Sequence, residues 1–190
     1  MMRLKKILCL ILASMLALSL AACGVGSPKV DYDTEFDSLM ERIEDLGEEA
    51  DYVATVNSVV WQEAGPDEVA SVLLELLTAS DASDLSYTAK NALTDYSTSE
   101  RTQIIKKYKE YYADLSAETE TLKTDLKSFK DACGDKHDDG VSALQQYFTK
   151  LQAYAEFATD PSGNLMNYRS NHQDFENDMK ELKSAAEFDK

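Results

Sequence analysis

Apolar side chains recur at alternating intervals of three and four residues through most of the chain after residue 34. The first run has one polar member and consists of Phe36, Leu39, Ile43, Leu46, Ala50, Val53, Asn57, Val60 and Ala64. These intervals keep one side of an α-helix facing a core. We therefore predict a long amphipathic helix that ends at Gly65-Pro66. Within it, Gly47 marks a bend or a close contact, and Asn57 is a structural residue that fixes the register of packing.

The same pattern returns in later segments, which are separated by turns rich in Gly, Pro, Ser or Asp. It predicts short helices over about residues 66–78 and 84–96, and long helices over about 99–132, 141–158 and 165–186. Ser97 and Glu100 have the spacing of a capping box ahead of the longest helix. We predict an all-α fold: one domain, residues 34–190, forming an antiparallel helical bundle of long amphipathic helices with short connecting helices.

The first 22 residues have the pattern of a secretory leader. Arg3, Lys5 and Lys6 precede an apolar run of 14 residues from Ile7 to Leu20. A permanent membrane helix needs roughly 20 apolar residues, so this run is too short to serve as one. We predict that residues 1–22 are a signal peptide that is cleaved after export.

The residues at the end of the leader resemble the lipobox of bacterial lipoproteins, with Leu20, Ala21 and Ala22 directly before Cys23. The resemblance implies that the thiol of Cys23 carries covalent diacylglycerol, and we expect no other cofactor. Because two acyl chains give stable membrane attachment, the exported chain would be held at the outer face of the cell membrane. Residues 23–33 would then form a lipidated tether ahead of the bundle.

Two short segments of the body also resemble known proteins. Residues 57–61, and the turn 161–165 followed by Tyr168, resemble parts of uncharacterised helical lipoproteins from Gram-positive bacteria. This resemblance implies no particular activity.

The charge of the chain excludes a class of partners. The leader contains three of the 19 basic residues and none of the 35 acidic ones, so the mature chain has a net charge of about −19. Nucleic-acid binding needs clustered basic residues, so we expect no nucleic-acid partner. The block from Asp31 to Asp51 has ten acidic residues against Arg42 alone. We interpret it as a solvated helix face, with a docking surface for cations or a cationic partner as the alternative.

Candidate metal ligands are few. Cys133 is the one cysteine left after Cys9 leaves with the leader and Cys23 is lipidated, and we interpret it as a small apolar residue at a helix end, with a reactive thiol as the alternative. The segment Asp135–Gly140 resembles the start of a calcium loop. It departs from that pattern at His137 in place 3 and at Gln146 in place 12, where a bidentate Glu is needed. We predict no metal site.

His172 occupies a core-facing position between Tyr168 and Phe175. A catalytic histidine needs a nucleophile, an orienting carboxylate or a metal, and no sequence motif supplies such a set. We therefore interpret His172 as structural and predict that the chain is not an enzyme. The ten tyrosines and Trp61 are expected to pack in the core. If Trp61, Tyr168 and His172 instead share an open face, they form a candidate binding site for a peptide or glycan.

Three functions follow from these patterns. The first is a lipid-anchored extracytoplasmic helical module that binds an envelope protein, a peptide or a glycan. The second is a structural or spacer lipoprotein of the envelope without a specific ligand. The third, and least favoured, is a hydrolase that depends on histidine or a metal. Self-association through the regular helix faces stays open.

Overall fold

The computed structural model describes residues 31–65 and 67–190. The chain forms six α-helices and one 3₁₀ helix in these ranges, namely α2 (Tyr32–Ala64), α3 (Val69–Thr78), α4 (Tyr87–Ala92), α5 (Thr98–Cys133), η2 (Gly134–His137), α6 (Asp138–Thr159) and α7 (Leu165–Asp189). No strand occurs in the described ranges, and the prediction of an all-α bundle is confirmed. The signal peptide and Cys23 lie outside the described residues, and α2 begins inside the segment predicted as tether.

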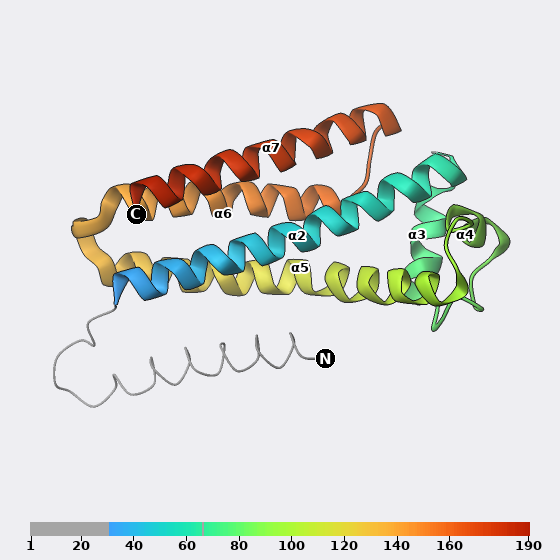
Figure 1. Ribbon diagram of the computed structural model, residues 1–190, viewed down its shortest axis with the longest axis horizontal. Coiled ribbons are helices and arrows are strands. Elements are labelled where there is room, and N and C mark those ends of the chain that lie inside the picture. Colours follow the sequence, from blue (N-terminus) through green and yellow to red (C-terminus); the bar gives the residue numbers. More distant parts are fainter. Residues whose placement is uncertain (1–30, 66) are drawn as a thin grey trace. The chain divides into compact units, whose positions relative to one another are not determined.

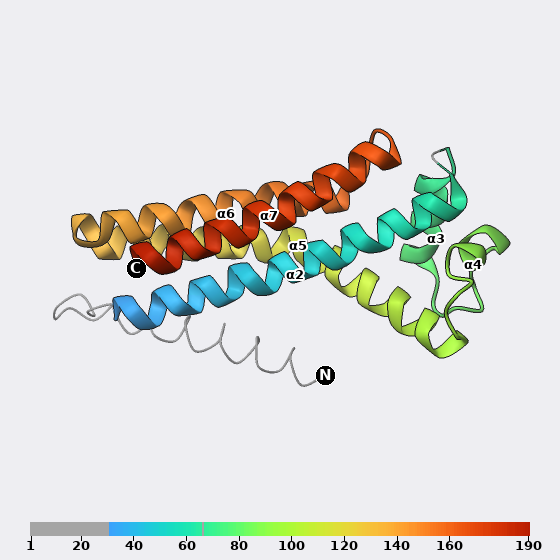
Figure 2. The ribbon, with the colours of Figure 1, turned by 45° about the horizontal axis from the view of Figure 1, so that its top comes forward.

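The four long helices pack side by side with alternating directions. In Figure 1, α2 and α6 run one way along the bundle, and α5 and α7 run the other way. Helix α2 contacts each of the other three, and α6 lies against both α5 and α7. Figure 2 shows α5 diverging from α2 towards its own N-terminus. There α3 packs against both α2 and α5, and α4 packs against α2 and α3. The short helices therefore close one end of the bundle.

Residues Tyr32–Lys190 form one compact unit with its own hydrophobic core. The predicted core-facing residues of α2 are buried from Phe36 to Val60, and those of α6 are buried from Val141 to Ala158. A unit that carries its own core meets the physical requirement for a domain that folds without the rest of its chain.

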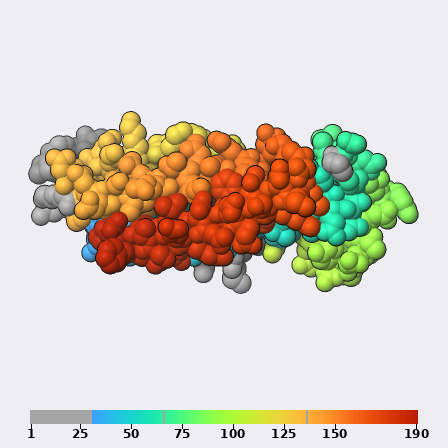
Figure 3. Space-filling view, turned by 90° about the horizontal axis from the view of Figure 1, so that it is seen from above, coloured from blue at the N-terminus to red at the C-terminus, as the bar shows by residue number. Residues whose placement is uncertain are grey.

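Helix α7 is less buried than its pattern predicted. Among the helices described, it packs on α6 and α2 and on no other, and Figure 3 shows it lying beside α6 on the outside of the bundle. Tyr168, Met179 and Ala186 are buried, whereas His172 and Phe175 are partly exposed. The difference arises because a helix at the edge of a bundle buries a narrower stripe of its own surface than a central helix does.

The connecting helices are shorter than predicted, and the turn predicted between them is held by local hydrogen bonds. Asp84 accepts a hydrogen bond from the backbone N–H of Ser80 at 3.1 Å, and Asp81 accepts one from that of Ser83 at 2.6 Å. Such side-chain bonds hold backbone N–H groups in turns and compete with helix formation. The predicted capping box is present, with Ser97 and Glu100 bonding each other's backbone N–H at the start of α5.

Asn57 is fully buried and connects the four long helices. Its Nδ2 donates to the carbonyl oxygen of Ala158 on α6 at 2.7 Å and to the hydroxyl of Tyr168 on α7 at 3.1 Å. Its Oδ1 accepts a hydrogen bond from the hydroxyl of Tyr108 on α5 at 2.7 Å. Because buried polar groups need partners, this set of bonds fixes the rotational position of each helix around Asn57.

Candidate functional site

The structure brings Trp61 and Tyr168 together inside the core. Their ring centroids lie 5.4 Å apart, and the residues are 4% and 1% exposed. The hydroxyl of Tyr168 is bonded to Asn57, and its ring stacks on Phe157 at 4.4 Å. Both residues are thus occupied by packing, and neither offers a ligand an open aromatic face. His172 lies one turn further along α7, half-buried and facing α2.

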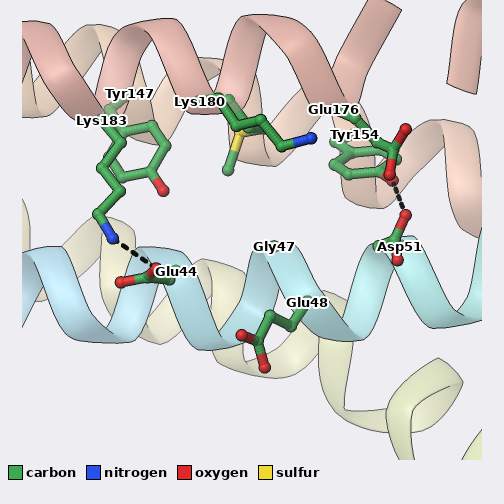
Figure 4. Close-up of a pocket in the computed structure, with 10 residues that line it drawn as sticks. Glu44, Gly47, Glu48, Asp51, Tyr147, Tyr154, Glu176, Lys180 and Lys183 are labelled. Atoms are coloured by element: carbon green, nitrogen blue, oxygen red, sulfur yellow. Dashed lines mark hydrogen bonds and ion pairs between the residues drawn. The ribbon is translucent and has the colours of Figure 1, made fainter. Parts of the chain in front are cut away.

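An open groove of about 260 Å³ lies between α2, α6 and α7. Figure 4 shows the residues of the three helices that line it, with the carboxylate of Glu48 turned away from α6 and α7. The lining residues are Glu44, Gly47, Glu48, Asp51, Tyr147, Tyr154, Glu176, Met179, Lys180 and Lys183. Six of these ten residues are charged, although most of the exposed surface inside the groove is apolar. The groove therefore differs in character from the aromatic site considered from the sequence.

Gly47 lets α7 approach α2 at the centre of this groove. A Cβ atom added to Gly47 would lie 3.0 Å from the terminal methyl group of Met179. The close contact predicted for Gly47 is therefore present, and its partner is α7. The absent side chain also leaves room for the charged residues on both sides of it.

At one end of the groove, Asp51, His172 and Glu176 form a half-buried cluster. The Nε2 atom of His172 is 2.8 Å from Oδ1 of Asp51, and one donor atom from each of the three residues lies within 4.8 Å of the others. Glu176 follows His172 by four residues, which places both on one face of α7. Tyr154 on α6 donates its hydroxyl hydrogen to Oδ1 of Asp51 at 3.0 Å.

These contacts keep Asp51 ionised. The hydrogen bond from His172 lowers the pKa of Asp51 below its usual range, and the bond from Tyr154 acts in the same direction, although burial opposes both. The pKa of Tyr154 is raised by burial and by the neighbouring charge of Asp51, so its hydroxyl keeps its proton and remains a donor. The cluster therefore presents a carboxylate whose position is fixed from two helices.

The opposite end of the groove is closed by an ion pair. The ammonium group of Lys183 on α7 donates to Oε1 of Glu44 on α2 at 2.5 Å. This hydrogen bond raises the pKa of Lys183, and Glu187 on the next turn lies 3.9 Å away. Both side chains are partly exposed, so the pair contributes little to stability, and it links α2 to α7 across this end of the groove.

The acidic block from Asp31 to Asp51 is not uniformly solvated. Arg42 donates to Asp125 on α5 at 2.7 Å, and Glu49 turns towards α5. Its Oε2 is buried without a hydrogen-bond partner among the described residues. Burial is the main reason that the pKa of Glu49 is raised to about 8. The negative charges of nearby carboxylates raise it further, and these belong to Glu118, Asp114, Asp45 and Glu110.

The segment Asp135–Gly140 does not form a calcium-type loop. Residues 134–137 make the 3₁₀ helix η2, and α6 begins at Asp138, so helical turns occupy the place of the loop. Asp135, Asp138 and Asp139 line an open cavity together with His137. The ring of His137 stacks on Tyr32 with centroids 3.7 Å apart. Cys133 is a half-buried free thiol that packs against the core, and burial raises its pKa.

The His172–Asp51 pair has the geometry of a base and its orienting carboxylate. In the described part of the chain, however, no serine or cysteine is hydrogen-bonded to His172. The sequence singled out His172 but not its partners. Glu176 is recognisable by its spacing of four residues from His172, whereas Asp51 was hidden within the acidic block, more than 100 residues away in the sequence.

The chain matches no protein-family model, no curated protein and no solved structure. Among the described residues, no helix combines the length and apolar character needed to cross a membrane.

Proposed function

We propose that the chain is a lipid-anchored extracytoplasmic binding module, and that its ligand contact is the groove between α2, α6 and α7. The observation that carries this proposal is the convergence of charged side chains from α2 and α7, beside two tyrosines of α6, on a solvent-open groove. These charged groups are partly or fully exposed and are not part of the core, which is formed mainly by apolar residues. They are the kind of preorganised polar groups that orient a ligand.

The size of the groove limits what it can hold. Sites for drug-sized ligands have volumes of roughly 300 to 1,000 Å³, and this groove has about 260 Å³. It therefore fits one or two side chains of an envelope protein or peptide better than a complete oligosaccharide. Carboxylates of Asp51 and Glu176 at one end favour a ligand that brings a positive group to that end.

A charge-swap variant tests the groove directly. Glu48 and Lys180 are exposed residues that line it, and the double variant Glu48→Lys with Lys180→Glu reverses both charges without changing the net charge. We expect the immobilised domain Val25–Lys190 to retain a partner from a solubilised envelope extract, and the variant to lose most of that partner. The measurement is quantitative mass spectrometry of the retained proteins.

The matched control is Glu120→Lys with Lys123→Glu. These residues form an exposed ion pair on α5, which contributes no residue to the groove. The control should retain the partner as the unmodified domain does. Equal retention by the groove variant would contradict the proposal.

The proposed address has its own test, which does not depend on the ligand. Replacing Cys23 with Ala in the full chain removes the thiol that the resemblance assigns to the lipid. We expect the unmodified chain to incorporate labelled palmitate and to sediment with membranes, and the variant to lose the label. A variant that keeps both the label and its membrane association would exclude lipidation at Cys23.

A spacer without a specific ligand is the second candidate, and the burial of Trp61 and Tyr168 favours it. In that role the charged groove only keeps α7 attached, and the capture experiment would retain no partner. The two roles are separated by whether binding depends on Glu48 and Lys180.

A further inference from the structure

We infer that Asp51, His172 and Glu176 form a binding site for a divalent transition-metal ion of the zinc type. The inference rests on the proposed binding function and names one ligand of the same groove. It is carried by a mixed set of donors, one imidazole nitrogen and two carboxylate oxygens, supplied by two helices that are packed against each other.

The donor atoms are already close to the spacing that a metal requires. Zinc binds imidazole nitrogen and carboxylate oxygen at about 2.0–2.2 Å, which places tetrahedral ligand atoms roughly 3.4 Å apart. The three donor atoms lie within 4.8 Å of one another, and His172 and Asp51 are 2.8 Å apart. Binding would replace the proton shared by His172 and Asp51 with the metal ion, and small side-chain rotations would complete the geometry.

Supporting contacts hold the donors in place. The hydroxyl of Tyr154 donates to Asp51 at 3.0 Å, which is the kind of outer hydrogen bond that orients a metal-binding carboxylate. The ring of Tyr154 stacks on Phe175 with centroids 5.0 Å apart and an angle of 3° between the planes. This contact fixes α7 against α6 between His172 and Glu176. The ligands are therefore carried by rigid helices and not by a loop.

The chemistry of the set selects the class of ion. Calcium takes six to eight oxygen ligands, and magnesium keeps an octahedral shell of oxygens, so an imidazole with two carboxylates suits neither. Imidazole together with carboxylate suits Zn²⁺ and its neighbours in the first transition row. Three protein ligands leave a fourth position, and Asp51 and Glu176 both line the open groove. A side chain or water entering the groove could occupy that position.

The test is a zinc titration of the domain Val25–Lys190, followed by NMR of the histidine rings. The chain has two histidines, and His137 is an internal control because it lies against Tyr32 in a separate cavity. We expect zinc to shift the ring resonances of His172 and to leave those of His137 unchanged. Cobalt(II) should give the visible absorption of a four-coordinate site with the same stoichiometry.

Calorimetry with variants completes the test. Glu176→Gln and His172→Ala should each weaken zinc binding by at least about 10-fold, while Glu120→Gln, an exposed acid on α5, should leave it unchanged. Circular dichroism shows whether each variant is folded. If His172→Ala does not fold, Glu176→Gln still provides the test. Weak binding that all variants share, or a shift of His137 in place of His172, would overturn the site. The capture variants alter Glu48 and Lys180 and leave the three proposed zinc ligands unchanged. Failure of the zinc site and failure of the proposed binding function would therefore give different results.

Discussion

Replacing Asn57 with Ala is expected to lower the free energy of unfolding by about 3 kcal/mol or more, the largest effect of any single substitution proposed for this chain. The amide of Asn57 bonds the hydroxyls of Tyr108 and Tyr168 and the carbonyl of Ala158. Its removal leaves these three groups without their partner in the core, at a cost of about 1 to 3 kcal/mol for each buried group that stays unsatisfied. Urea unfolding monitored by circular dichroism measures the change.

Two further variants show whether the cost comes from the unsatisfied hydroxyls. Asn171→Ala on the exposed face of α7 is the matched control and should change the free energy by less than about 0.5 kcal/mol. Adding Tyr108→Phe to Asn57→Ala removes one stranded hydroxyl, so the double variant should be more stable than Asn57→Ala alone. Equal stability of the two variants would mean that water bonds the hydroxyl of Tyr108 in Asn57→Ala. The hydrogen bonds of Asn57 would then contribute less to the free energy of unfolding than expected.

Replacing Glu49 with Gln is expected to stabilise the fold in a pH-dependent way. The pKa of Glu49 is raised from 4.5 to about 8 in the folded state, so the fold holds this carboxyl in its neutral form. Below about pH 4.5 the carboxyl is neutral in both states and carries no penalty. As the pH rises towards 8, the unfolded state ionises while the folded state resists, and stability is lost.

Gln resembles the neutral carboxyl and cannot ionise, so the variant avoids that loss. We expect it to be about 1 to 3 kcal/mol more stable than the unmodified chain at pH 9, a value reduced for partial solvent exposure, with little difference at pH 4. Urea titrations at pH 4, 6.5 and 9 provide the comparison. Glu41→Gln, an exposed acid on the same helix, should show no such rise with pH. A constant difference between Glu49→Gln and the unmodified chain at every pH would contradict the assignment.

The sequence predicted the long helices well because their apolar spacing reflects burial directly. The core-facing residues of α2 and α6 are buried as the pattern indicates. Prediction failed where local bonds or position in the bundle decide the outcome. Ser86 caps α4 by accepting a hydrogen bond from the backbone N–H of Ala89, so this helix begins at Tyr87 and not at about residue 84. Periodicity also cannot distinguish a central helix from a peripheral one, so the partial exposure of α7 was not foreseen.

The candidate site was predictable only in part. His172 stood out because an imidazole among apolar positions needs a partner. That partner, Asp51, lies on a helix distant in sequence, and helix order in space decides which carboxylate comes within 2.8 Å. Trp61 and Tyr168 were considered together from the sequence and do meet, at a centroid distance of 5.4 Å, but in the core. Residue type indicated that these rings would pack in the core, whereas their contact depended on the packing of all four long helices.

The two ends of the compact unit lie next to each other. The ammonium group of Lys190 is 2.7 Å from Oδ1 of Asp37 on the first turns of α2, and Figure 1 shows the C-terminus at the end of the bundle where α2 begins. A Cβ atom on Gly140 would touch the hydroxyl of Tyr32 and would lie 3.0 Å from the carbonyl oxygen of Asp189, so three helix ends meet there. The first helix of the unit therefore begins at the end of the bundle where the last helix ends. Joining the two ends of the unit and opening the chain in the α3–α4 connection should therefore produce a circular permutant in which the four long helices keep the same packing partners.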